Sequence, residues 1–132
     1  MKGKCEPHWR IWGVVLLSLA LTPGAIRPLS RASVCSIRWG ADRRHVTVAM
    51  RRETMRRYGI RTMVARGKGP CCELDHLIPR ELAGADSVDN LWPQPWADAV
   101  TKDREENRLH RAVCTGQIPL REAQERMRAW PH

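Results

Sequence analysis

Residues 73–79 (ELDHLIP) and 90–95 (NLWPQP) decide the fold of this chain. Each is a short extended-type stretch that closes on a proline, and the turn-rich residues 83–89 separate the two. Residues 96–114 follow directly and form the longest helical pattern in the sequence, ended by Gly116. Two extended segments joined by a loop and followed by a helix predict a ββα unit.

Further segments surround this unit. Residues 21–33 contain two prolines and a glycine, so we expect an extended segment on the surface. Residues 47–58 predict an amphipathic helix that ends at Gly59, and residues 120–130 predict a last helix after Pro119. The expected fold class is α+β, with an arginine-rich arm over residues 21–68 and the ββα domain over residues 69–132.

The positive charge is concentrated in the predicted arm. The whole chain carries a net charge of +9. Residues 27–68 hold eleven arginines and one lysine against two acidic residues, a net charge of +10, whereas residues 69–132 are net acidic. Such an arm is typical of proteins that bind a polyanion, because each phosphate contact releases counterions. The alternative is a solvated face that only keeps the protein soluble.

The first residues predict export. Residues 1–10 are basic, and residues 11–21 form an uncharged apolar run that is short for a bilayer span but suits a secretory signal. Small residues at positions 18 and 20 would permit cleavage after Ala20. We therefore expect a signal peptide over residues 1–20 and a secreted or periplasmic protein without membrane contact. An uncleaved anchor or a misassigned start codon are the alternatives.

Cleavage would remove Cys5 and leave Cys35, Cys71, Cys72 and Cys114. Four cysteines in an exported domain of this size indicate disulfides. Pairing of the two adjacent cysteines is the least favourable because it closes a strained ring. We expect a bond between Cys35 and Cys114, although the sequence alone does not decide the pairing. The adjacent cysteines then either anchor the first strand or remain free thiols.

Asp75 and His76 are the first candidates for chemistry. Neighbours in an extended run point to opposite sides. This arrangement suits phosphodiester hydrolysis, in which a carboxylate holds a metal on one side of the phosphate and an imidazole activates water on the other. An exposed pair without a function is the alternative.

The long helix adds three polar candidates. At 100° per residue, six residues share the arc that we expect to be buried: Trp96, Ala99, Val100, Leu109, Val113 and Cys114. Asp103, Glu106 and His110 fall within the same arc. Buried carboxylates and imidazoles need partners, and a metal ion is one of them. We expect Asp103, ahead of His110, to bind the metal and Glu106 to pair with another residue.

These stretches together resemble the HNH endonuclease family, and more narrowly its small secreted bacterial members. The resemblance rests on residues 73–84, 90–95 and 102–110, and extends to residues 22–25 and Cys35. It therefore spans most of the mature chain. The combination of Asp-His with Asn-Leu-Trp-Pro-Gln is more specific than Asp-His with asparagine alone.

The resemblance implies a role for each residue. Asp75 would be the first metal ligand, His76 the general base, and Asn90 the residue that orients His76. The family has a histidine or asparagine on the helix as a further ligand. Asp103 is the substitute we expect, with His110 as the alternative.

The ligand set bears on the metal. Oxygen ligands favour Mg²⁺ or Mn²⁺, whereas His110 would admit Zn²⁺ or Ni²⁺. Arg80 replaces an apolar residue of the family pattern, and it would either contact phosphate or be solvated.

The resulting expectation is a metal-dependent endonuclease that hydrolyses phosphodiester bonds in DNA, or also RNA, with low sequence specificity. An immunity or inhibitor protein is a partner that this function would admit. The first alternative is a non-catalytic DNA-binding protein on a degenerate HNH scaffold. The second is a surface protein whose basic arm binds acidic polymers or membranes.

Overall fold

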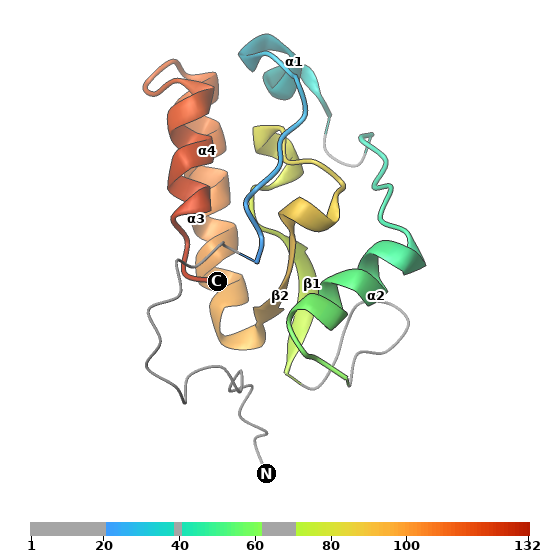
Figure 1. Cartoon of the computed structure of the whole chain (residues 1–132). Helices are drawn as coiled ribbons and strands as arrows, with labels where there is room; N and C mark the ends of the chain where they lie inside the picture. Colours follow the sequence, from blue (N-terminus) through green and yellow to red (C-terminus); the bar gives the residue numbers. More distant parts are fainter. Residues whose placement is uncertain (1–20, 39–40, 62–70) are drawn as a thin grey trace.

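The computed structural model describes residues 21–38, 41–61 and 71–132. Its fold is α+β, as expected, with an antiparallel ribbon of two strands and four α-helices among these residues (Figure 1). The predicted signal peptide lies outside the described residues. No described helix has the length and apolarity needed to cross a membrane.

The predicted strand–loop–strand–helix order is confirmed. Strand β1 (Cys72–His76) pairs with β2 (Leu91–Pro95), and Asp75 lies opposite Trp92. Helix α3 (Trp96–Cys114) begins directly after β2 and ends before Gly116, whose φ of 77° suits a glycine. Helix α4 (Leu120–Arg128) follows Pro119 and lies beside α3 (Figure 1).

The core lies between α3, α4 and the loop that connects the strands. That loop contains two short 3₁₀ turns, η2 (Arg80–Leu82) and η3 (Val88–Asn90). The central buried residues come from the loop and both helices: Ile78, Leu82, Leu109, Val113, Ala123 and Met127. This core fixes the position of β1 relative to α3.

The described residues that precede the ribbon, 21–38 and 41–61, form the N-terminal half and pack against the same unit. Helix α2 (Val48–Arg57) contacts β2 and η3, so the ribbon lies between α2 and α3 (Figure 1). Thr47 caps α2 by accepting a hydrogen bond from Met50 N, and the helix ends at Arg57, with Tyr58 as its C-cap directly before Gly59, close to the predicted end. The hydroxyl of Thr22 joins this half to the ribbon through Leu91 O at 2.8 Å.

The extended segment predicted over residues 21–33 is correct only in its first part. Ser30 accepts a hydrogen bond from Ser33 N and starts helix α1 (Arg31–Ser36). A serine can cap a helix or lie in a turn. Because prolines precede Ser30, the turn was the simpler interpretation, and the sequence did not reveal that a helix follows it. The helix matters because it places Cys35 next to α3.

Candidate functional site

His76 ends β1 with both ring nitrogens engaged. Nε2 lies 2.7 Å from Asp86 Oδ1, and Nδ1 lies 2.9 Å from an Arg44 guanidinium nitrogen. Because a guanidinium only donates, Nδ1 accepts from Arg44 and Nε2 donates to Asp86. Burial, together with the charge of Arg44, lowers the pKa of His76, which keeps the ring neutral. The imidazole has one hydrogen and one lone pair, and both are in use.

Asp86 is a site residue that the sequence analysis missed. Burial alone would raise the pKa of Asp86, but hydrogen bonds from Arg80, the His45 backbone and His76 lower that pKa to about 2. The carboxylate is therefore ionised and fixes the orientation of the imidazole. The feature of the sequence that could have identified Asp86 is that it is a carboxylate in the loop connecting β1 to β2.

Arg80 was expected to contact phosphate or solvent. Its guanidinium instead pairs with Asp86 and Asp42 and donates to Arg43 O at 2.7 Å. The side chain is only 15% exposed. Arg80 therefore supports Asp86 and anchors the segment that carries Arg44.

The side chain of Asn90 hydrogen-bonds to backbone groups, whereas the His76 ring bonds to Arg44 and Asp86. Its Oδ1 accepts from Ile78 N at 2.9 Å, and its Nδ2 donates to Ile78 O and Ala85 O. All these partners are backbone groups of the loop between the strands. The orientation of His76 that the resemblance assigned to Asn90 is supplied by Asp86, and Asn90 fixes the loop.

Lys102 is the second residue that the sequence analysis missed. Its side chain is fully buried, and Nζ lies 2.8 Å from Asp75 Oδ2 and 2.7 Å from His76 O, with Glu106 as its third partner. Burial raises the pKa of Glu106 to about 7, against the attraction of Lys102. The predicted pairing of Glu106 with another residue is confirmed. The ammonium group lies where the resemblance implied a metal ion beside Asp75.

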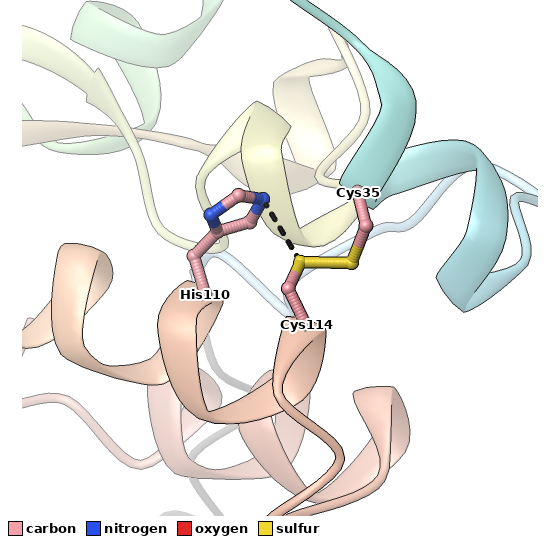
Figure 2. Close-up of side chains that lie close together, drawn as sticks. All are labelled: Cys35, His110 and Cys114. Carbon is pink, nitrogen blue, oxygen red and sulfur yellow. Dashed lines mark hydrogen bonds between the residues drawn. A yellow bond between two sulfur atoms is a disulfide. The ribbon is translucent and has the colours of Figure 1, made fainter.

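The structure does not bring Asp75, Asp103 and His110 together. Asp103 is exposed on α3. Within residues 21–38, 41–61 and 71–132, Cys35, His110 and Cys114 are the only group of three or more potential ligands with mutual reach (Figure 2). The predicted oxygen-rich site does not fit a divalent metal here, because its first carboxylate already binds an ammonium group.

The expected bond between Cys35 and Cys114 is confirmed, with a Cα–Cα distance of 5.6 Å. Cys71 and Cys72 are also joined at the start of β1, the pairing that ring strain disfavours. Once Cys35 and Cys114 have paired, these two are the remaining cysteines of the described chain.

The sulfur–histidine group could hold a metal ion. The ligand atoms of Cys35, His110 and Cys114 lie within 4.8 Å of one another, and His110 Nε2 is 3.6 Å from Cys114 Sγ (Figure 2).

Comparison with known proteins found no significant match for this chain among protein-family models, curated proteins or solved structures.

Proposed function

We infer that this protein binds nucleic acid on a ββα scaffold related to the HNH nucleases, and that Asp75 and His76 form no metal-dependent catalytic centre in it. The position of Lys102 carries this conclusion. A buried ammonium with two carboxylates and a carbonyl as partners provides the charge balance that a cation would otherwise provide. Asp75 is thereby committed to a structural ion pair.

The distribution of arginines supports a nucleic-acid ligand. Several arginines of the N-terminal half pair with carboxylates, among them Arg27 with Asp42 and Arg57 with Asp89. Others are exposed on the same half: Arg38, Arg43, Arg52 and Arg61. Exposed guanidinium groups bind phosphate through paired N–H donors. Contacts of this kind position a protein on the backbone without reading sequence.

Binding is tested by fluorescence anisotropy with labelled duplex DNA across a salt series. The double variant Arg43→Ala/Arg52→Ala should raise Kd roughly 10-fold and reduce the slope of log K against log salt by about 0.9 for each lost phosphate contact. Arg111→Ala/Arg121→Ala removes the same charge from exposed sites in the C-terminal half and should bind as the parent does. Equal effects of both pairs would contradict a defined surface. Anionic vesicles bound in place of DNA would contradict a nucleic-acid ligand.

Cleavage is tested by plasmid nicking with Mg²⁺, Mn²⁺, Zn²⁺ or Ni²⁺, and with chelator. We expect the plasmid to stay intact in every condition in which it is bound. Nicking that requires a metal and disappears in His76→Ala would show a metal-dependent catalytic centre at Asp75 and His76 and restore the metal-dependent nuclease.

The pair of His76 and Asp86 favours hydrolysis without a metal as a second candidate function. Asp86 holds the tautomer in which Nδ1 has a lone pair, as a general base requires. Nδ1 becomes available when Arg44 moves to a phosphate. This candidate predicts nicking in chelator that His76→Ala and Asp86→Asn both abolish. Because the pKa of His76 lies below its usual value, the rate would persist below pH 6.5.

A further inference from the structure

Cys35, His110 and Cys114 form a compact group away from the His76 pair. Cys35 lies on α1, whereas His110 and Cys114 lie one turn apart on the same face of α3 (Figure 2). Cys35 is exposed, and the other two are half-buried. The group is thus held by two packed elements and is accessible from solvent.

The distance between His110 and Cys114 suits a tetrahedral metal, once reduction lets the two sulfurs separate. Zinc binds sulfur at about 2.3 Å and imidazole nitrogen at about 2.0 Å, so a sulfur and a nitrogen on one ion lie about 3.5 Å apart. The distance between His110 Nε2 and Cys114 Sγ is 3.6 Å. All three ligand atoms lie within 4.8 Å of one another. The histidine is therefore already at the separation that shared coordination requires.

We propose that reduction of the Cys35–Cys114 disulfide converts this group into a Zn²⁺ site with two thiolates and one imidazole. A phosphine reductant breaks the S–S bond and takes an oxygen atom from water, and the two sulfurs become thiols. Each thiol loses a proton when it binds the ion. In the disulfide form His110 Nε2 donates to Val34 O at 3.4 Å, so metal binding requires the other tautomer, which has its hydrogen on Nδ1.

The chemistry of the ligands selects the metal class. Two thiolates and an imidazole favour Zn²⁺ over the hard cations Mg²⁺ and Ca²⁺. Arg31 donates to Cys114 O at 3.2 Å, which holds α1 against the end of α3 and keeps Cys35 near the other two ligands. Three protein ligands leave the fourth position of the tetrahedron to water, which distinguishes this site from a closed structural one. The disulfide form lacks thiolates, so metal binding and the disulfide exclude each other.

The test uses the full chain with Cys5→Ser, Cys71→Ser and Cys72→Ser, so that only the two cysteines of the site remain. The protein is compared before and after treatment with a phosphine. We expect the reduced form to retain one equivalent of Zn²⁺ in equilibrium dialysis and the oxidised form to retain none. Co²⁺ in place of Zn²⁺ should give thiolate charge-transfer absorption and the visible bands of tetrahedral coordination. A reduced protein that retains no Zn²⁺ would overturn the proposal.

His110→Ala in the same background tests the imidazole. Loss of this ligand should weaken Zn²⁺ binding by roughly 10- to 100-fold or more, because losing only a residue that hydrogen-bonds to a metal ligand already weakens binding by that range. His45→Ala removes an exposed histidine outside the group and should bind Zn²⁺ like the background protein. Circular dichroism of the oxidised variants checks their fold. Equal Zn²⁺ affinity with and without His110 would overturn the three-ligand site.

A second measurement needs no histidine variant. Zn²⁺ should slow alkylation of the two thiols in the reduced background protein, and chelator should restore the rate. Alkylation that Zn²⁺ does not change would contradict thiolate ligation. Neither result depends on nucleic-acid binding, so this proposal and the proposed function fail separately.

Discussion

Lys102 joins strand β1 to helix α3 through its ammonium group. The fully buried Nζ has Asp75, Glu106 and the carbonyl of His76 as partners. Two carboxylates around one ammonium leave a negative charge in excess, and burial keeps Glu106 protonated to about pH 7. The group is therefore close to neutral inside the protein, which is what makes its burial tolerable.

Replacing Lys102 with methionine should lower the free energy of unfolding by about 3 kcal/mol at pH 8, because it leaves two half-buried carboxylates without a counterion. The triple variant with Asp75→Asn and Glu106→Gln added should recover part of this loss. Urea denaturation measures both, and Arg104→Ala on the exposed face of α3 is the control. A single variant as stable as the parent would contradict the role of the ion pair.

Glu106 should make stability depend on pH. Its pKa is about 7 in the folded protein and 4.5 in an unperturbed side chain, so the folded state holds the proton more tightly between these values. Its contribution is complete below pH 4.5 and is lost as the pH rises through 7. The lowered pKa of His76 acts in the opposite direction, so the comparison of Glu106→Gln with the parent isolates Glu106. Melting temperatures from pH 5 to 8 should fall more steeply with pH in the parent, and parallel curves would exclude the effect.

At the scale of elements, the loop between the strands depends on Asn90. Its buried amide makes three hydrogen bonds to backbone groups of Ile78 and Ala85. Gly84 approaches the Ile78 carbonyl so closely that a Cβ there would clash with it. The loop is thus built around a side chain that replaces backbone pairing.

Asn90→Ala should lower the free energy of unfolding by about 3 kcal/mol, since it leaves buried backbone groups without partners. Asn107→Ala is the matched control, because Asn107 is exposed on α3 and its amide bonds only to Asp103 O. Its effect should stay within about 0.5 kcal/mol. Thermal or urea unfolding of both variants decides the matter, and comparable losses would show that the Asn90 amide has no special role.

The elements were largely predictable, and the side-chain partners were not. Proline and glycine positions mark the strands and α3 in the sequence, because they restrict the backbone locally. The arc assigned to the buried face of α3 was wrong near its start, where Trp96 is 42% and Val100 is 60% exposed. The pattern of apolar residues along α3 cannot reveal that Lys102 is buried, because what stabilises its buried ammonium group is a pair of carboxylates.

At the scale of the whole molecule, the candidate site joins segments that are distant in the sequence. His76 has two side-chain partners. Asp86 lies ten residues away in the loop that follows β1, and Arg44 comes from the N-terminal half. Local periodicity carries no information on such pairs, so Asp75 and His76 were found from their own pattern while Asp86 and Arg44 were not. The same packing holds α1 against α3, with the disulfide between them.

That disulfide should supply a large share of the stability. It joins residues 79 positions apart, and closing a loop of this length in the unfolded chain corresponds to about 4 kcal/mol in the chain-entropy account. Cys35→Ser/Cys114→Ser should therefore unfold at a much lower urea concentration than the parent. Cys71→Ser/Cys72→Ser removes a bond between neighbours, which constrains almost no loop, and should change the midpoint little. If the two double variants lost stability equally, the bond between α1 and α3 would not supply the share of stability that its long loop predicts.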